Sequence, residues 1–294
     1  KGSDHTQRIV AERRAGKYLA DLLMGGSSSY ATYAPGTLEP LKPLLILPEV
    51  ADMSAWLNGR LYFADAENRA AVIISGEIGT RRGSYNTQLL DPKEITSWWD
   101  LLQPKWKGKL ASFDPRVAGG GGETFLFFYY TPALGRKYIT RLLSETDLLL
   151  TRDLQQGTDW LANGKILFYI GSGQPIMKAK KQGLPVDLLP HPMKEGDIMG
   201  GGSCCMAVMN RAPHPNATKL FINWVLSREG QSAWQKYAEV NSLRVDIPKI
   251  DLPANDVPQK GVNYFMLNSS QYNGQAGRKD LHKIVDDALK GKKG

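Results

Sequence analysis

Short apolar runs alternate with amphipathic segments along most of the chain. The apolar runs predict buried strands at residues 18–24, 70–75, 109–113, 166–170, 186–189 and 204–209. The amphipathic segments predict helices at residues 6–17, 95–102, 123–130, 134–143 and 174–181, and a further helix from Asn216 onward. Strands that alternate with helices predict an α/β fold, in which helices surround a mainly parallel sheet.

The most regular helical pattern follows Asn216. Its apolar residues recur at intervals of three and four positions and are Ala217, Leu220, Phe221, Trp224 and Val225. This spacing is typical of one apolar helix face, and it predicts that these side chains point into the core.

Loops rich in glycine and serine follow several of the predicted strands or precede helices. They are Gly2-Ser3 and residues 25–29, 119–124 and 171–174, and a fifth loop at 200–203 precedes a strand. In α/β sheets, ligands bind where such loops lead from strand ends into helix N-termini, whose N–H groups favour anions. The candidate contacts in these loops are Gly2, Ser3, Gly26, Ser27, Ser28, Gly121, Thr124, Ser172 and Ser203. Turn formation alone also selects glycine and serine, so a structural role stays open.

Three larger side chains extend this candidate site. Arg81 offers paired donors for a carboxylate or phosphate, although an ordinary surface position also explains it. Tyr169 and Trp160 offer aromatic walls, and core packing explains both of them equally well. The hydroxyl groups and the arginine together favour a ligand with oxyanion character, such as a phosphonate, a phosphate ester, a carboxylate or an iron chelate.

Composition limits the possible functions. The 294 residues suffice for two lobes, and 42% hydrophobic with 22% charged residues exclude a disordered chain. The longest apolar runs are far shorter than the ~20 residues of a membrane helix, so none is predicted. The net charge of +8 comes from dispersed Lys and Arg residues without a nucleic-acid-binding motif. We therefore predict no nucleic-acid partner.

The chain lacks the sequence signatures of a catalytic or metal site. Its four histidines are isolated from one another, and no nucleophile-elbow, zinc-protease, phosphate-loop or dinucleotide motif occurs. A disulfide between the neighbours Cys204 and Cys205 would be strained, and no third cysteine is present to pair with either, so we interpret them as small buried strand residues. These absences predict a protein that is not an enzyme and that needs neither cofactor nor metal.

Several blocks of sequence carry a more specific signal. They are residues 8–17 (RIVAERRAGK), 97–109 (SWWDLLQPKWKGK) with Asp114-Pro115, 210–217 (NRAPHPNA), 221–224 (FINW) and 226–231 (LSREGQ). Together they resemble extracellular solute-binding proteins of bacterial ABC importers, in the family that includes the periplasmic ferric-ion binders. The resemblance spans roughly residues 2–246, and its final blocks are the most specific.

The resemblance implies a type II periplasmic-binding-protein fold, an α/β fold of two lobes joined by a hinge. Lobe 1 would comprise residues 1–75 and 205–294, and lobe 2 would comprise residues 80–203. The hinge crossovers would lie near residues 74–80 and 203–209. The same comparison predicts that the first strand, the first helix and most of the second strand of lobe 1 precede Lys1 in a longer protein.

The resemblance also implies a function. The protein would be a monomeric periplasmic or extracellular receptor, compatible with a lipid anchor, that closes around a small molecule and delivers it to ABC permease subunits. Ferric binders use adjacent tyrosines near the return crossover, but residues 202–205 contain none, and the pair Tyr129-Tyr130 lies in an apolar helical run. A ferric binder without the tyrosine pair and a sensory module of the same fold remain alternatives, and an enzyme is a weaker one.

Overall fold

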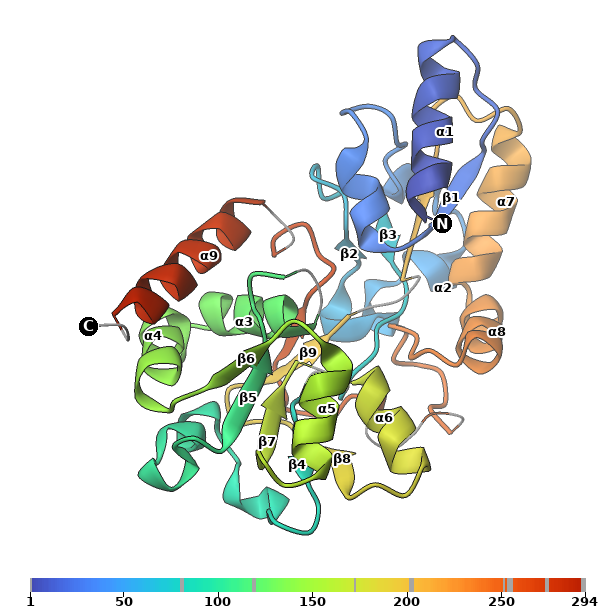
Figure 1. The fold of residues 1–294 in the computed structure, drawn as a ribbon. Coiled ribbons are helices and arrows are strands. Elements are labelled where there is room, and N and C mark those ends of the chain that lie inside the picture. Colours follow the sequence, from blue (N-terminus) through green and yellow to red (C-terminus); the bar gives the residue numbers. More distant parts are fainter. Residues whose placement is uncertain are drawn as a thin grey trace. The chain divides into compact units, whose positions relative to one another are not determined.

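The computed structural model describes residues 2–79, 82–117, 120–171, 173–200, 204–250, 252, 256–272 and 275–291. The chain divides into two compact units, each with its own sheet and helices (Figure 1). Unit 1 comprises Lys1–Glu77, Gly200–Val257 and Asn268–Asn273, and unit 2 comprises Ile78–Met199, Pro258–Leu267 and Gly274–Gly294. In the described ranges, none of the helices combines the length and apolar character that a membrane span requires.

Unit 2 is built on a five-stranded sheet with the order β6-β5-β7-β4-β8. Its strands are β4 (Ser84–Asn86), β5 (Leu110–Phe113), β6 (Leu149–Thr151), β7 (Phe168–Ile170) and β8 (Val186–Leu188). Strands β5, β6 and β7 run parallel, whereas β4 is antiparallel to both of its neighbours. The helices are α3 (Gly120–Tyr130), α4 (Gly135–Glu145), α5 (Leu154–Ala162), α6 (Gln174–Lys181) and α9 (Gln275–Lys290), with 3-10 turns η5 (Pro92–Glu94), η6 (Trp98–Leu102) and η7 (Pro104–Trp106). Strands β9 (Asp197–Met199) and β11 (Tyr264–Met266) form a separate parallel pair.

The sheet of unit 2 is buried on both faces, because each strand alternates its side chains between two helical layers. Tyr169 of β7 joins a core cluster with residues of α5 and α6, and Figure 1 shows these two helices over one face of the sheet. The neighbouring Phe168 packs on the opposite face against Trp98, whose ring also contacts Phe128 of α3. The predicted arrangement of helices around a mainly parallel sheet is therefore confirmed for this unit.

The C-terminal part of the chain corrects the predicted lobe boundaries. The sequence placed all of residues 205–294 in lobe 1, but Pro258–Leu267 and Gly274–Gly294 belong to unit 2. They do so because β11 pairs with β9 and because α9 packs against α3 and α4. These contacts join segments that are far apart in sequence, and no local pattern of residues predicts them.

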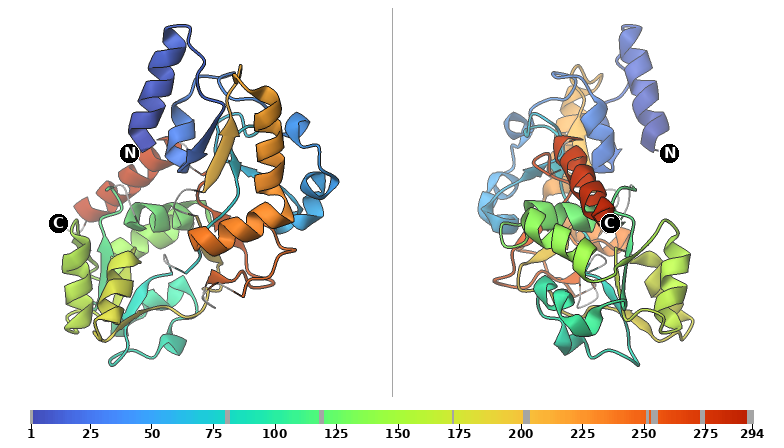
Figure 2. Two further views of the ribbon diagram at one scale, coloured as in Figure 1. Left: turned by 90° about the vertical axis from the view of Figure 1, so that its right-hand side faces the viewer. Right: turned by 60° about the vertical axis from the view of Figure 1, so that its left-hand side comes forward.

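Unit 1 contains a four-stranded sheet with the order β1-β10-β3-β2. Its strands are β1 (Leu22–Gly25), β2 (Tyr62–Phe63), β3 (Val72–Ile73) and β10 (Cys205–Val208). All three pairings of these strands are antiparallel, so the prediction of a mainly parallel sheet is wrong for unit 1. Its helices are α1 (Gly2–Arg14), α2 (Pro48–Ala51), α7 (Pro215–Leu226) and α8 (Arg228–Ala238), with 3-10 turns η1 (Ser27–Thr32), η2 (Lys42–Leu44), η3 (Met53–Ala55) and η4 (Leu57–Gly59). Figure 2 shows α7 beside β10, with α8 following it.

Helix α7 buries a different face from the one that its apolar spacing predicted. Four of the five predicted core residues are exposed, namely Ala217, Leu220 at 71%, Phe221 at 39% and Trp224 at 44%, and only Val225 is buried as predicted. The buried positions are Thr218, Ile222, Asn223, Val225 and Leu226. Asn223 is buried because its side-chain oxygen accepts hydrogen bonds from the backbone N–H groups of Ile46 and Leu47. A polar contact with a distant segment thus selects the face that α7 turns inward.

The predicted elements of unit 2 lie near their predicted positions. Helix α6 has the predicted bounds, and α3 begins at Gly120 instead of residue 123. The predicted helix at residues 95–102 is shortened to the 3-10 turn η6, which begins after a capping box formed by Ser97 and Asp100. Pro104 lies two residues after η6 and cannot extend it with a backbone N–H donor.

Candidate ligand site

The parallel strands of unit 2 end at one edge of the sheet, and a helix begins after each of them. Helix N-termini carry backbone N–H groups without intrahelical partners, and their dipoles favour anions. Asp153 caps α5 by accepting hydrogen bonds from the N–H groups of Gln155 and Gln156. Helix α6, by contrast, has no side-chain cap among the described residues. Pro175 in the first turn of α6 has no backbone N–H, so the other backbone N–H groups of that turn are the donors left for a ligand.

Arg82 reaches the same edge from the antiparallel strand. It precedes β4 by two residues, and Ser84 of β4 lies opposite Tyr169 near the end of β7. Between them, Gly83 has a φ of 92°, and a Cβ atom there would come within 2.3 Å of Phe168 Cζ. Glycine alone tolerates both this conformation and this close approach, which hold the backbone next to Arg82 against the sheet.

The guanidinium group of Arg82 is buried but only partly hydrogen-bonded. The side chain is 1% exposed, and its Nε donates to Asp197 Oδ2 at 2.6 Å. Among the described residues, neither Nη1 nor Nη2 finds a hydrogen-bond partner. Burying charged donors without acceptors is unfavourable, so these two groups indicate a ligand that supplies the acceptors.

Asp197 fixes the orientation of this guanidinium. Its side chain is 3% exposed, and its Oδ1 accepts a hydrogen bond from Ile198 N at 2.8 Å. Burial raises the pKa of the Asp197 carboxyl group, while the adjacent Arg82 cation counteracts that rise. Because Nε is occupied, Nη1 and Nη2 are the two groups of this buried guanidinium that still have donors for a ligand, and together they form a fork. Such a fork matches two oxygens of a carboxylate or phosphate.

Two of the predicted contacts, Gly121 and Thr124, lie in the first turns of α3. A Cβ atom at Gly121 would come within 2.2 Å of Phe113 O, so glycine lets α3 begin against the end of β5. Thr124 is 0% exposed and already engaged in interactions within the protein. Both residues therefore shape the edge of the sheet, and Thr124 contributes to its packing.

Tyr169 does not form the wall that the sequence suggested for it. Its side chain is 0% exposed and belongs to the core between the sheet and α5. A Cβ atom at Gly157 of α5 would lie 2.3 Å from Tyr169 Cζ, so the ring fills the space that this glycine leaves. The ring is core because helices cover both faces of β7. Trp160 is partly buried, and Lys165 Nζ lies 4.4 Å from its ring centroid.

The remaining predicted contacts lie in unit 1 or outside the described residues. Ser27 is buried and accepts a hydrogen bond from Asn268 Nδ2 at 2.8 Å. Gly26 precedes η1, which contains Ser28. Gly2 and Ser3 form the start of α1. Arg81, Ser172 and Ser203 lie outside the described residues.

The sequence analysis selected Arg81 as a ligand contact and missed Arg82, although the glycine directly after Arg82 marked a close approach of the backbone.

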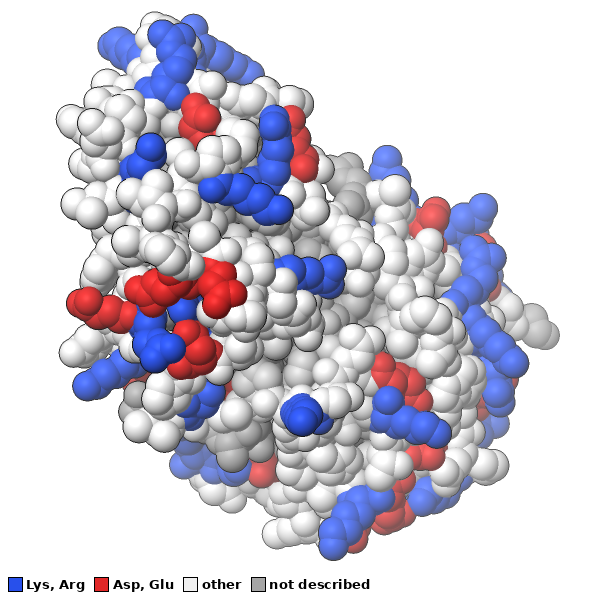
Figure 3. Space-filling view, turned by 180° about the vertical axis from the view of Figure 1, so that it is seen from behind, with Lys and Arg blue, Asp and Glu red and all other residues white. Residues whose placement is uncertain are grey.

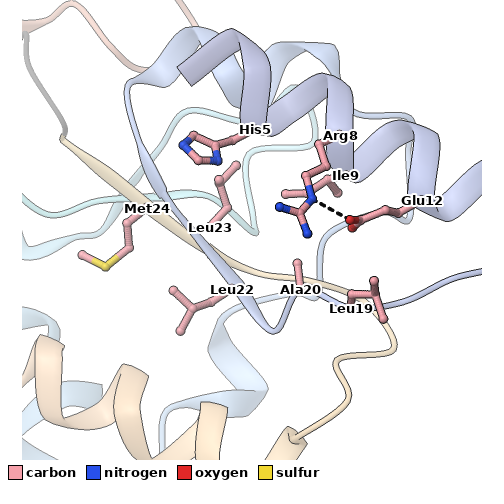
Figure 4. Close-up of a pocket in the computed structure, with 9 residues that line it drawn as sticks. All are labelled: His5, Arg8, Ile9, Glu12, Leu19, Ala20, Leu22, Leu23 and Met24. Atoms are coloured by element: carbon pink, nitrogen blue, oxygen red, sulfur yellow. Dashed lines mark hydrogen bonds and ion pairs between the residues drawn. The ribbon is translucent and has the colours of Figure 1, made fainter. Parts of the chain in front are cut away.

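A separate cavity in unit 1 lies between α1 and the segment that contains β1 (Figure 4). Its volume is about 320 Å³, and its lining residues are His5, Arg8, Ile9, Glu12, Leu19, Ala20, Leu22, Leu23 and Met24. Arg8 donates to Glu12 at 2.7 Å, and the Arg8 side chain is 74% exposed. An exposed ion pair of this kind contributes little. The cavity therefore lacks a buried donor comparable to Arg82.

The described residues contain no group of three or more His, Cys, Asp and Glu side chains that is arranged to hold a metal ion. The tyrosine pair lies on the side of α3 that faces α9, where Tyr129 donates to Asp280 at 3.2 Å. The Tyr129 and Tyr130 rings meet edge to face, with 4.9 Å between their centroids. The pair therefore has a packing role between two helices.

Charged side chains are mixed on the surface. Figure 3 shows Lys and Arg side chains spread over the face that it draws, with Asp and Glu side chains between them. Elsewhere in the molecule, as on this face, opposite charges occur close together, and the ion pairs include Lys180 with Asp187 and Arg141 with Glu145. On that face the positive charge is therefore dispersed, as the sequence predicted.

Comparison with known proteins places these features in a family. The model of the bacterial extracellular solute-binding protein family matches residues 63–237, more than half of the chain. An uncharacterized protein of Haemophilus influenzae is 26% identical over 169 residues, which cover 56% of this chain and 47% of that protein. The chain thus spans about half the length of the curated relative that it matches.

Solved structures resemble the whole chain. The Bordetella ferric binding protein aligns with a TM-score of 0.65 and 16% identity, over 96% of this chain and 87% of that one. The periplasmic binding protein AfuA from Actinobacillus pleuropneumoniae, with fructose-6-phosphate bound, aligns with a TM-score of 0.57 and 20% identity, over 98% of this chain and 88% of that one. At these identities the likeness shows the fold, which is the α/β fold of type II periplasmic binding proteins.

Proposed function

Because the chain belongs to the family of bacterial extracellular solute-binding proteins, as its sequence blocks predicted, we propose that it is a receptor for a small oxyanionic solute and not an enzyme. One observation carries the choice of ligand. The guanidinium of Arg82 is buried, and its Nη groups have no acceptor among the described residues. A bound anion would supply that acceptor.

The chemistry of this edge favours an anion over a cation. Asp197, the carboxylate next to Arg82, is already paired with Nε and accepts a backbone hydrogen bond, so it offers little to a cationic ligand. The fork of Nη1 and Nη2 and the uncapped first turn of α6 both supply N–H donors. AfuA holds fructose-6-phosphate, which supports a phosphate ester as the first candidate. Phosphonates, carboxylates and iron chelates present the same oxygens.

We further propose that the receptor works outside the cytoplasm as a monomer and delivers its solute to the membrane subunits of an ABC importer. In this mechanism the ligand contacts both lobes and shifts a hinge equilibrium toward the closed form, which the importer recognises. The unit boundaries after Glu77 and after Met199 support a hinge, because the chain passes between the units near the predicted crossovers.

A ligand panel tests the proposal. The protein is unfolded and refolded to remove any co-purified ligand, and sugar phosphates, phosphonates, citrate and ferric citrate are then compared by thermal shift and calorimetry. Spermidine serves as the cationic control. We expect at least one oxyanion class to raise the melting temperature, because a ligand at 100 times its Kd adds about 2.7 kcal/mol to stability. Spermidine should leave the melting temperature unchanged.

Two variants connect the binding signal to Arg82. Arg82→Lys keeps the positive charge but loses the fork, so we expect binding about 10- to 100-fold weaker. Arg141→Met removes an exposed arginine of the same unit and should leave the affinity unchanged. The proposal fails if no oxyanion binds the wild type, or if Arg82→Lys binds as tightly. A ligand recovered chemically altered after incubation would favour an enzyme.

A further inference from the structure

Cys204 and Cys205 place two thiols together inside unit 1. Cys205 is the first residue of β10 and Cys204 directly precedes it, and β10 has neighbours on both sides in the four-stranded sheet. Both side chains are buried, at 0% and 1% exposure, and both are free cysteines. Their Sγ atoms are 2.6 Å apart, a separation that approaches the bond length of about 2.0 Å in a disulfide.

Cys204 lies just outside the regular strand, at the point where β10 begins. Successive side chains of a strand point to opposite faces of the sheet, whereas these two sulfur atoms meet. Hydrogen bonds hold the peptide that joins the two cysteines and the peptide that follows it. The carbonyl of Cys204 accepts from Ile74 N at 2.8 Å, and the carbonyl of Cys205 accepts from the Tyr30 hydroxyl at 2.9 Å. Contacts with β3 and η1 therefore maintain the conformation in which the two thiols converge.

We propose that Cys204 and Cys205 are a redox site, which forms a disulfide between neighbouring residues when the chain meets a disulfide oxidant. One cysteine thiolate attacks the S–S bond of the oxidant, which gives a mixed disulfide and releases one thiolate of the oxidant. The second cysteine thiolate then attacks the protein sulfur of the mixed disulfide and releases the other. The cysteines lose two protons and two electrons, and the oxidant becomes two thiols.

The burial of the pair decides when this exchange takes place. Burial raises the pKa of the Cys205 thiol, and the thiolate is the form that reacts. The exchange is therefore slow in the folded protein and takes place before the sheet of unit 1 closes, or while it is locally open. The proposed location outside the cytoplasm is an oxidising one, in which a disulfide persists. The ring would stiffen the strand by which the chain re-enters unit 1, just after the boundary at Met199.

Refolding followed by thiol counting tests this site and does not depend on where the protein works. The wild type is unfolded with reductant, freed of it and refolded with oxidised and reduced glutathione. It is then acid-quenched, unfolded and treated with N-ethylmaleimide before intact mass measurement. We expect a monomer without alkyl groups, lighter than the reduced chain by two hydrogen atoms. Reduction before alkylation should add one alkyl group for each of Cys204 and Cys205.

Single-cysteine variants provide the matched controls. Cys204→Ser and Cys205→Ser cannot close the ring, so each should carry one alkyl group or one glutathione after the same treatment. Cys204→Ala/Cys205→Ala, followed by circular dichroism, checks that folding does not need the thiols. Two alkyl groups on oxidised wild type, a lasting glutathione adduct or a disulfide-linked dimer would each overturn the proposal. None of these outcomes bears on ligand binding at Arg82, so the two proposals succeed or fail separately.

Discussion

Each unit of this protein buries an arginine, and the two arginines differ in how completely they are hydrogen-bonded. Arg244 in unit 1 and Arg82 in unit 2 each have 1% of the side chain exposed. In Arg244, Nε and Nη2 donate to Asp246, and Nη1 donates to the carbonyl groups of Glu49 and Leu226. In Arg82 only Nε has an acceptor among the described residues. The two guanidinium groups are therefore equally buried, but every nitrogen of Arg244 has an acceptor whereas two nitrogens of Arg82 have none among the described residues.

This difference separates a structural charge from one that can bind a ligand. A buried group with all its partners joins the segments that carry them, and Arg244 joins α2, α7 and the segment around Asp246. A buried group with donors left over indicates a missing acceptor. The two sheets also differ in how many helix N-termini they bring to one edge. Parallel strands in unit 2 gather helix N-termini at one edge, whereas neighbouring antiparallel strands in unit 1 end at opposite edges.

The largest effect is expected at Arg244. Arg244→Met should lower the free energy of unfolding by about 3–5 kcal/mol, because it leaves Asp246 and two backbone carbonyl groups without their buried partner. Urea denaturation measures this change. The matched control is Arg228→Met, since Arg228 also donates to Asp246 but is 64% exposed, and its loss should cost less than about 1 kcal/mol. Equal losses in the two variants would remove the structural role assigned to Arg244.

The second prediction concerns the pair Arg82 and Asp197. Arg82→Met/Asp197→Leu removes both charges at once, so no uncompensated charge remains buried. We expect the free energy of unfolding to stay within about 1 kcal/mol of wild type or to rise. Affinity for the oxyanion identified by the ligand panel should fall about 100-fold or more, which corresponds to about 2.7 kcal/mol. Urea denaturation and calorimetry on the same preparation measure both quantities.

The double variant also shows how the comparison could fail. A loss of stability as large as that of Arg244→Met would make Arg82 a structural residue, whatever its unused donors. Asp197→Asn is the companion variant, because it keeps the size of the side chain, removes its charge and leaves one acceptor oxygen in place of two. If Asp197→Asn retains affinity while the double variant loses it, Arg82 itself is the group that binds the anion.

Local sequence patterns predicted strands β5, β7 and β8 and helices α3, α4 and α6 of unit 2, but they missed β4, β6, α5 and α9. They predicted little of the strand order of unit 1. Helix α6 has its predicted bounds, since an amphipathic period and flanking glycines specify a short helix by themselves. The position of β10 between β1 and β3 depends instead on pairing across the chain, with Cys205 opposite both Gly25 and Ile73. Nothing near Cys205 in the sequence encodes either neighbour, so the antiparallel order was not predictable from periodicity.

The sequence proposed Arg81 as a ligand contact, whereas the unpaired buried donors in the structure belong to Arg82. These two adjacent arginines look alike in sequence. The choice between them depends on Asp197, which is 115 positions away and holds Nε of Arg82. Tyr169 shows the same limit, because the space that receives its ring is created by Gly157 on another element. The local sequence thus shows which side chains could donate hydrogen bonds or fill space, but it does not show which distant residues they contact.

The smallest expected effect concerns Asp114, a third buried charge that lies in unit 2 but has its partners. Its side chain is 3% exposed and accepts hydrogen bonds from Arg116 and Arg152. Burial raises the pKa of this carboxyl group, but the hydrogen bonds from Arg116 and Arg152 outweigh it and lower the pKa from 3.8 to about 2. If complete hydrogen bonding is what makes a buried charge structural, Asp114 should resemble Arg244 although it shares a unit with Arg82.

The contribution of Asp114 to the free energy of unfolding depends on pH in a way that can be measured. The folded state binds the Asp114 proton less tightly than the unfolded state, so the carboxylate adds stability above pH 3.8 that is lost as the pH falls toward 2. The full contribution is about 2 kcal/mol, and about 1 kcal/mol of it disappears between pH 5 and pH 3. Asp114→Asn should therefore lose about 1 kcal/mol less than wild type over that interval in urea denaturation.

Asp286→Asn, which removes an exposed partner of Arg116, is the control, and its free energy of unfolding should change with pH as steeply as that of wild type. An unchanged slope in Asp114→Asn would mean that complete hydrogen bonding does not identify structural charges, and the contrast between Arg244 and Arg82 would then lose its basis.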